Sequence, residues 1–359
     1  MILKTECNCI GLIEVLHIGQ VATVSIFIVL SLYFAGSIDS DLQKITIKAP
    51  PFDNILAQSK KNNNRKEPNL RPAGVTIYRV PEKKMRTVLK YPGSKWNIAS
   101  RLVELIPEHH SYVEPFFGSG AVLFNKPVSD IETINDLDHD VVNLFRCIQH
   151  DSERLARMVM TTPFSREEYD NQFEIPRGAV CIDAYERAAG FLTRCWQGHG
   201  FRTNGSKVGW KNDVQGRERA YALWNWYRLP EWIVDIAERL RMVQIENRPA
   251  LEVIERFNYS NVFMYIDPPY VLGARAGKQY KHEMSDADHE ELLKLLLQSK
   301  AKIMLSGYES EMYNDYLTGW EKKQFSSCAE HGKPRTETVW MNYKADLQMN
   351  FGDFPEVLP

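Results

Sequence analysis

The sequence predicts an α/β fold whose buried strands end at a shared ligand-binding edge. Three stretches support this prediction. Residues 261–266 form a short apolar run rich in β-branched and aromatic residues, and Asp-Pro-Pro-Tyr follows it. Residues 111–117 lead into a Gly-Ser-Gly turn, and residues 134–138 read Ile-Asn-Asp-Leu-Asp. Strands that end in such turns are typical of open α/β sheets, which bind ligands at the carboxyl ends of their strands.

Length and composition set the broad class of the protein. The 359 residues leave room for one large domain or two ordinary ones. The formal net charge of −2 gives no global signal for nucleic acid, so such binding requires a local basic patch. The six cysteines are scattered, without a Cys-x-x-Cys pair, which indicates neither a zinc site nor a disulfide framework. Free thiols fit a reducing compartment, so we expect a cytoplasmic protein.

Residues 1–84 form an atypical N-terminal extension. With histidine taken as neutral, no side chain between residues 15 and 38 is charged. This stretch is compatible with a transmembrane helix, a buried helix or a pair of strands. Glu6 and Glu14, and the lack of an Ala-x-Ala site, argue against a signal peptide.

Residues 58–84 are polar and rich in lysine, asparagine and proline, as expected of a flexible or disordered linker. A well-patterned segment then opens at Met85. We therefore favour a functional protein that begins at Met85, with a misplaced start upstream. A membrane anchor through residues 15–38 is the second interpretation.

The first patterned segment passes from an apolar lead into Lys-Tyr-Pro-Gly-Ser-Lys at residues 90–95. Pro-Gly predicts a turn, and Gly93 allows a ligand to approach the backbone closely. The spacing is not that of a phosphate-binding P-loop. Residues 97–106 then predict a helix.

The next two strands predict a cofactor site. Glycines after the strand at residues 111–117 let a cofactor lie against the strand end, with the N–H groups of a helix starting over residues 121–125 facing it. An acid at the end of the following strand is the usual partner of ribose hydroxyls. Asp136 and Asp138 both qualify, and either could instead cap the helix over residues 140–149. The pair predicts an adenosine-bearing cofactor.

The turn at residues 267–270 suits attack by an exocyclic amine. The lone pair of such an amine is delocalised into its aromatic base, which makes it a poor nucleophile. The Asp267 carboxylate and the Pro268 carbonyl can accept its hydrogens and return electron density to nitrogen. Tyr270 can stack on the base, as aromatics do in pockets for extruded nucleotides. The alternative is a turn that only ends a strand, since prolines cannot continue one.

Residues 151–245 change character, with helices predicted over residues 151–160, 166–171, 181–195 and 217–227. The loop over residues 196–211 contains glycines, aromatic residues and basic side chains. Its cations would neutralise phosphates and its polar groups would read base edges. The alternative is a solvated loop whose tryptophans pack a small core. We favour DNA binding for the basic cluster, with Arg194, Arg202, Asn204, Lys207, Lys211 and Arg217 as candidates.

The C-terminal third continues the α/β pattern. We expect the polar loop over residues 271–283 to close over a flipped base. Ser285 and Asp288 resemble a capping box that opens a helix through Gln298. Residues 301–306 predict another buried strand.

Residues 86–345 resemble the D12 class of DNA N6-adenine methyltransferases, the Dam-like enzymes of bacteria and their phages. The matching segments are KYPGSK, EPFFGSG, NDLD and DPPY, with SGYES and ETVWMNY toward the C-terminus. An initial aspartate with a final tyrosine in DPPY resembles adenine enzymes more than cytosine-N4 enzymes, which usually start with serine. The stretch before residue 85 has no counterpart in this pattern.

The resemblance implies a Rossmann-like, S-adenosyl-L-methionine (AdoMet)-dependent methyltransferase sheet with an inserted helical target-recognition domain. We expect the catalytic domain over residues 85–150 and 246–345, the insert over 151–245 and a tail over 346–359. Double-stranded DNA is the implied partner, with a cognate restriction enzyme left open. No metal is implied, and we expect a monomer.

Residue roles follow from the same resemblance. The implied cofactor-binding residues are Tyr91, Lys95, Glu114, Phe116, Gly118, Gly120, Asp136 and Asp267. The implied catalytic residues are Asp267, Pro268, Pro269 and Tyr270.

The expected activity is a direct, in-line methyl transfer to N6 of an extruded adenine, without a covalent enzyme intermediate. Two alternatives stand beside it. One is an AdoMet-dependent methyltransferase acting on cytosine N4 or RNA. The other is a catalytically idle DNA-binding protein of the same fold.

Overall fold

The chain, described here from a computed structural model, divides into two compact units, Met1–Arg79 and Val80–Pro359. The described residues are 3–5, 13–18, 21–26, 85–174, 183–200, 202–212, 221–271, 277–328 and 334–345. The predicted linker over residues 58–84 and the tail over 346–359 lie outside them.

The first unit holds a three-stranded antiparallel sheet in the order β1-β2-β3. Its strands are β1 (Leu3–Thr5), β2 (Ile13–Ile18) and β3 (Val21–Ile26). Of the interpretations of residues 15–38, the structure has a strand pair as far as Ile26, and residues 27–38 lie outside its description. Within the described part of the chain, none of the helices has the length and apolar character needed to cross a membrane.

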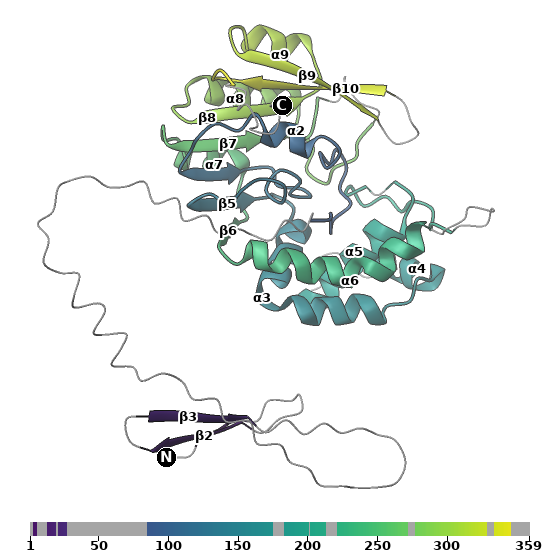
Figure 1. Cartoon of the computed structure of the whole chain (residues 1–359). Helices are drawn as coiled ribbons and strands as arrows, with labels where there is room; N and C mark the ends of the chain where they lie inside the picture. Colours follow the sequence, from purple (N-terminus) through teal and green to yellow (C-terminus); the bar gives the residue numbers. More distant parts are fainter. Residues whose placement is uncertain are drawn as a thin grey trace, which may run out of the picture. The chain divides into compact units, whose positions relative to one another are not determined.

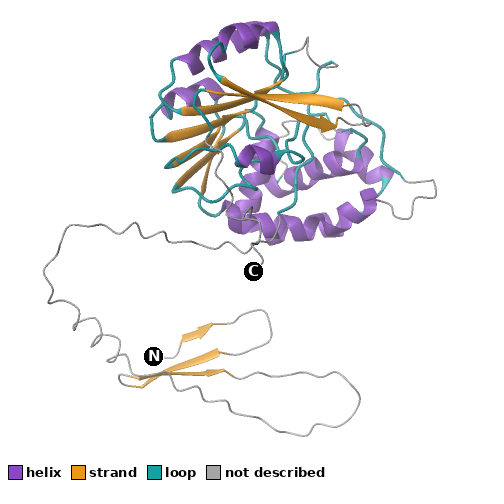
Figure 2. Cartoon of the chain, turned by 45° about the horizontal axis from the view of Figure 1, so that its top comes forward, coloured by secondary structure: helices purple, strands orange, loops and turns teal. Residues whose placement is uncertain are grey.

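The second unit is built on a seven-stranded mixed sheet, which Figure 2 shows as a twisted layer with helices on both faces. Its order is β6-β5-β4-β7-β8-β10-β9. The strands are β4 (Ser111–Glu114), β5 (Ile131–Asn135), β6 (Val243–Glu246), β7 (Val262–Ile266), β8 (Lys302–Gly307), β9 (Glu321–Cys328) and β10 (Pro334–Met341). Neighbours from β6 to β8 pair in parallel, whereas β10 runs antiparallel to both β8 and β9.

The strand order creates a switch point at the centre of the sheet. The chain starts at β4, adds β5 and β6 on one side, and then returns to place β7 and β8 on the other. Loops after β4 and β7 therefore leave in opposite directions and open a crevice at the carboxyl ends of these strands, where open α/β sheets bind ligands. This arrangement confirms the predicted α/β fold and brings the carboxyl ends of β4, β5 and β7 to one edge of the sheet.

The second unit carries helices between most of its strands. They are α2 (Ala99–Val103), α3 (His139–Thr161), α4 (Arg166–Glu174), α5 (Ala184–Gln197), α6 (Tyr221–Leu240), α7 (Ala250–Arg256), α8 (Asp286–Leu297) and α9 (Glu311–Tyr316). The predicted capping box is present at α8, where the Ser285 side chain accepts from the Asp288 backbone and the Asp288 carboxylate accepts from Ser285.

Two helix predictions were wrong in part. The helix predicted over residues 97–106 shortens to α2, because Leu105 and Ile106 donate to carbonyls three residues back and tighten the last turn before Pro107. Residues 121–125 form turns and no helix. Few residues separate the positive-φ Gly120 from Pro127, so a helix has little room to propagate between them.

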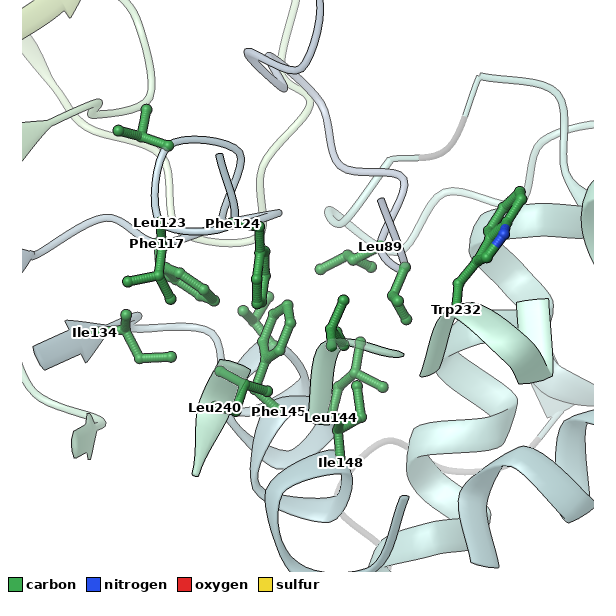
Figure 3. Packing of buried hydrophobic residues seen from close by; sticks show 14 of the residues in the cluster. Leu89, Phe117, Leu123, Phe124, Ile134, Leu144, Phe145, Ile148, Trp232 and Leu240 are labelled. Carbon is green, nitrogen blue, oxygen red and sulfur yellow. The ribbon is translucent and has the colours of Figure 1, made fainter. Parts of the chain in front are cut away.

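Both faces of the sheet are buried, as the apolar character of the central strands requires. Side chains alternate along β7, so Phe263 and Tyr265 join one hydrophobic cluster while Met264 and Ile266 join the other. The first cluster, part of which appears in Figure 3, continues into α3, α5 and α6. The second packs under α7, α8 and α9.

The helices of residues 151–245 lie beside one another at one end of the sheet (Figure 1). The predicted boundary at residue 151 falls inside α3, at a kink where Asp151 leaves the helical conformation (φ −152°, ψ 81°). The predicted return at residue 246 falls on the last residue of β6. Trp232 of α6 and Phe263 of β7 belong to one hydrophobic cluster, so these helices share their core with the sheet.

Candidate active site

One cavity of about 290 Å³ opens at the switch point. Its walls come from the ends of β4, β5 and β7, from residues 91–95 and from residues 280–284. It therefore brings together the predicted glycine turn and the predicted catalytic turn. Of the predicted site residues, Tyr91, Lys95, Glu114, Phe116, Gly118, Asp136, Asp267 and Pro269 line it, whereas Gly120, Pro268 and Tyr270 do not.

The two acids after β5 divide the roles that the sequence left open. Asp138 caps α3, because its Oδ1 accepts from the Asp140 backbone N–H at 3.0 Å. Asp136 holds the loop edge of the cavity, since its carboxylate accepts from the backbone N–H of Gly118 and of Asp138, each at 2.8 Å. Burial raises the pKa of Asp136 to about 7, although these N–H groups oppose the shift.

Glu114 ends β4 and is fully buried at the back of the cavity. Its Oε1 accepts from the Tyr112 hydroxyl at 2.5 Å and from the Leu123 backbone N–H at 2.8 Å. Burial raises the pKa of Glu114 to about 8. Two hydrogen bonds therefore fix the side chain in place, and burial leaves it mostly protonated at neutral pH.

Asp267 follows β7 and is paired with a lysine from the first predicted turn. Lys95 Nζ donates to both Asp267 carboxylate oxygens at 2.8 Å and to the Gly93 carbonyl at 2.6 Å. Burial lowers the pKa of Lys95, but the neighbouring Asp267 and Glu337 carboxylates outweigh it and raise the pKa above its usual value. Burial raises the pKa of Asp267, with Lys95 opposing.

Tyr270 is buried beside the cavity and does not form its wall. Its hydroxyl donates to Glu337 on β10, and its ring meets Tyr308 edge-on with centroids 4.6 Å apart. Lys95 Nζ lies 4.8 Å from the centre of the Tyr270 ring. Stacking of Tyr270 on a target base thus stays a prediction.

The glycines of the predicted cofactor turn serve close packing. Gly120 has φ +67°, and a Cβ there would lie 2.4 Å from Phe117 and 2.6 Å from Phe124. Gly118 has φ +50°, and a Cβ there would lie 3.0 Å from the Tyr91 ring. Gly118 therefore lets Tyr91 reach the cavity, whereas Gly120 lets the turn pack on the aromatic core.

The basic loop of residues 196–211 is closed at its base. Gly198 and Trp210 form an antiparallel bridge, and Lys211 N donates to the Gln197 carbonyl at 2.7 Å. Trp196 is buried and donates to the Val88 carbonyl at 2.7 Å. Trp196 and Trp210 therefore pack the structure, as the alternative interpretation of these tryptophans proposed.

The predicted DNA-binding side chains do not share one environment. Arg202 is exposed, and Lys207 is half exposed and pairs with Asp170 at 2.8 Å. Arg194 is largely buried near Asp140, at 3.7 Å. Asn204 donates its side-chain amide to the Lys278 carbonyl, Lys211 is half-buried, and Arg217 lies outside the described residues.

Hydrogen bonds join this basic loop to the segment that covers the cavity. Thr203 N donates to the Gln279 carbonyl and Lys281 N donates to Thr203 Oγ1, both at 2.9 Å. Tyr280 lines the cavity and donates its hydroxyl to the Pro92 carbonyl at 3.1 Å. The basic loop is thereby hydrogen-bonded to residues 277–283, the segment we call the cavity cover.

Sequence reasoning assigned no role to three groups at this site. Glu337 stands in ETVWMNY, Tyr280 in the loop after the catalytic turn and Lys281 beside it. Lys281 Nζ lies 3.3 Å from Asp138 Oδ1. Within the described ranges there is also no group of three or more His, Cys, Asp or Glu side chains placed to hold a metal ion.

Comparison with known proteins gives a consistent result. The family model of D12 class N6 adenine-specific DNA methyltransferases matches residues 91–329, more than half of the chain. A DNA adenine methylase of Serratia marcescens is 25% identical over 252 residues, which cover 65% of this chain and 87% of that protein. The type II methyltransferase M.MjaIII of Methanocaldococcus jannaschii is 25% identical over 269 residues, covering 67% of this chain and 90% of that protein.

Proposed function

The chain belongs to the D12 class of N6 adenine-specific DNA methyltransferases, and we propose that it methylates adenine N6 within a specific sequence of duplex DNA. Membership supports AdoMet-dependent adenine methylation; the target context and the mechanism are our proposal. The observation that carries it is the common cavity, in which the Asp267 turn of β7 faces the Gly118 turn of β4.

The cavity suits AdoMet by the chemistry of its lining. The carboxyl groups of Glu114, Asp136, Asp138 and Asp267 line it against the single buried ammonium of Lys95, and a bound cation favours their ionised forms. AdoMet has a sulfonium and an ammonium against one carboxylate, so this acidic surface attracts it. Phe116, Pro249 and Leu251 supply apolar surface for its base. When bound there, AdoMet would supply the electrophilic methyl group.

The protein's own groups then act by positioning. Asp136 would accept from ribose hydroxyls, as the resemblance implies. Asp267 and the Pro268 carbonyl accept hydrogens of the target amine and hold it in line with the methyl group, which polarises its lone pair. Because a base inside a duplex is out of reach, the adenine must be extruded first.

Surface cations would bring DNA to this cavity. The pair between Lys207 and Asp170 is half exposed, so breaking it in favour of a phosphate costs little. Arg202 lies next to Thr203, whose hydrogen bonds reach the cavity cover. Phosphate contacts at this loop would therefore affect the position of the cavity cover.

The test is expression in a host that lacks adenine methylation, followed by single-molecule sequencing of its DNA. We expect N6-methyladenine in one sequence context, and resistance of that DNA to an endonuclease blocked by the modification. Mass spectrometry of digested DNA and RNA separates the alternatives. N4-methylcytosine or a methylated RNA base would replace the proposal, and AdoMet binding without any methylation would favour the idle DNA-binding protein.

AdoMet should bind more tightly as the pH rises from about 6 to about 7.5. Burial raises the pKa of Asp136 to about 7, so this carboxyl is largely protonated at the lower pH. Hydrogen bonds from the ribose hydroxyls favour the ionised form of Asp136, so binding releases a proton and the Kd falls by up to about tenfold per pH unit below the pKa. Isothermal titration calorimetry measures this. Asp136→Asn should bind more weakly with a flatter profile, and an unchanged slope would exclude Asp136 as the titrating group.

Loosening the cavity cover should speed AdoMet release. Thr203→Val removes the hydroxyl that accepts from Lys281 N, which is worth about 1 kcal/mol. We expect the dissociation rate of AdoMet to rise about three- to tenfold, measured by stopped-flow tryptophan fluorescence. Thr318→Val is the matched control, because its exposed hydroxyl bonds only carbonyls of its own helix turn. Equal rates in both variants would show that the Thr203 contact does not hold the cover.

A further inference from the structure

The catalytic carboxylate is already occupied in this structure. Both oxygens of Asp267 accept from Lys95 Nζ at 2.8 Å, so the ammonium sits between them. A target amine needs at least one of these oxygens. A bound cation also withdraws electron density from the carboxylate and weakens it as an acceptor. Each oxygen can accept a second hydrogen bond, but Asp267 polarises an amine more strongly once Lys95 has moved away from it.

Lys95 cannot retreat into water. Its side chain is 5% exposed, and a buried ammonium without a carboxylate partner is costly. A second carboxylate lies within reach, because Glu337 Oε1 is 3.6 Å from Lys95 Nζ. Closing that gap to an ordinary ion-pair distance takes a shift of roughly 1 Å. The Gly93 carbonyl, 2.6 Å from Nζ, can hold the ammonium throughout this shift.

Glu337 is fixed in the right place to receive the lysine. It stands on β10, where Thr338 pairs with Gly307 of β8 and fixes the register of the strand. Its side chain is also buried, and its Oε1 accepts from the Tyr270 hydroxyl. Burial raises the pKa of Glu337, with Lys95 opposing, so the two carboxylates compete for one cation.

We propose, building on the proposed methyl transfer, that Glu337 is a positioning residue which takes Lys95 from Asp267 when the target amine binds. The amine's hydrogens replace the ammonium at Asp267, and Lys95 remains paired at Glu337. No bond is made or broken in this exchange. Through the Tyr270 hydroxyl, the same carboxylate also holds the aromatic ring of the catalytic turn.

The test is Glu337→Gln, which keeps the side chain's shape and an oxygen for the Tyr270 hydroxyl but removes the charge that receives Lys95. We expect the single-turnover rate at saturating AdoMet and DNA to fall about 10- to 100-fold. The Kd values for AdoMet and DNA should stay within about threefold of wild type, by calorimetry and fluorescence anisotropy. Glu337→Asp retains the charge at a longer distance, so its rate should lie between the two.

The controls separate the possible failures. Glu290→Gln breaks an exposed lysine–glutamate pair on α8 and should match wild type in rate and affinity. A folded Glu337→Gln variant with the wild-type rate at saturation would overturn the proposal, as would a variant whose only defect is a higher Kd for AdoMet. If Glu337→Gln fails to fold, a wild-type rate in Glu337→Asp overturns it. Absence of DNA methylation by the wild-type protein would instead contradict the proposed function.

Discussion

Replacing Asp267 by alanine is expected to abolish DNA methylation, with kcat/KM lowered by about 10³-fold or more while the protein stays folded. Asp267 is the only acid of the catalytic turn, and in our proposal it both orients the target amine and restores electron density to its nitrogen. Losing one preorganised group that acts on the reacting atoms costs about 10²–10³ in rate, and losing alignment adds to that.

The fold should survive this change because Lys95 keeps other partners. The Gly93 carbonyl lies 2.6 Å from Nζ and Glu337 lies 3.6 Å away, so the ammonium is not left alone. Transfer of tritiated methyl groups to unmethylated genomic DNA measures the rate. Circular dichroism and thermal unfolding verify the fold. Asp315→Ala, at an exposed position on α9, is the matched control and should retain full activity.

Retained methylation in a folded Asp267→Ala variant would contradict the assignment of the catalytic turn. Asp267→Asn refines the result, since the amide keeps one acceptor oxygen without charge. A rate between those of the Asp267→Ala variant and the wild type would indicate that hydrogen bonding without charge supplies part of the rate enhancement.

The strand ends and turns of the site were predictable because their signals are local. The apolar run before Asp267 predicts a buried strand, and β7 occupies Val262–Ile266 with every residue buried. The acid pair after β5 predicted a helix cap and a cavity residue; both acids line the cavity, and Asp138 is also the cap of α3. Parallel pairing of neighbouring strands is enough to bring their carboxyl ends to the same edge of the sheet.

The pairings across the site could not be predicted, because they depend on register between distant segments. Lys95 and Asp267 are 172 positions apart, and the sequence around Lys95 equally suits a solvated lysine in a tight turn. Glu337 reaches Tyr270 only because the antiparallel β10 lies against β8.

The turns at residues 121–125 could not be predicted either, since an apolar pattern cannot reveal how little space lies between Gly120 and Pro127.

Another pairing with no sequence signal ties the helices of residues 151–245 to the sheet. Glu132 of β5 is buried and accepts from both Arg239 of α6 and Lys126. Arg239 also donates to the Leu123 carbonyl at 3.3 Å, while the Leu123 N–H donates to Glu114 at the cavity. Burial raises the pKa of Glu132, but the two cations outweigh it and hold the pKa below its usual value.

Replacing Arg239 by methionine should therefore lower the free energy of unfolding by about 2–3 kcal/mol, less than the roughly 3–5 kcal/mol of a buried charge left unpaired, because Lys126 stays paired with Glu132. Methionine fills much of the same volume, so the loss reports the charge and its hydrogen bonds more than a cavity. Urea unfolding followed by tryptophan fluorescence measures it.

Arg241→Met supplies the comparison that isolates burial. Arg241 pairs with Glu238 at 3.3 Å just beyond the end of α6, but both side chains are more than two-thirds exposed, at 71% and 78%. An exposed pair of this kind contributes about 0–1 kcal/mol, so Arg241→Met should leave the unfolding midpoint nearly unchanged. If both variants unfold at the same urea concentration, the buried cluster does not hold α6 to the sheet. A large loss confined to Arg239→Met would instead show that the buried ion pair between α6 and β5 stabilises the fold, whereas the exposed pair beside it does not.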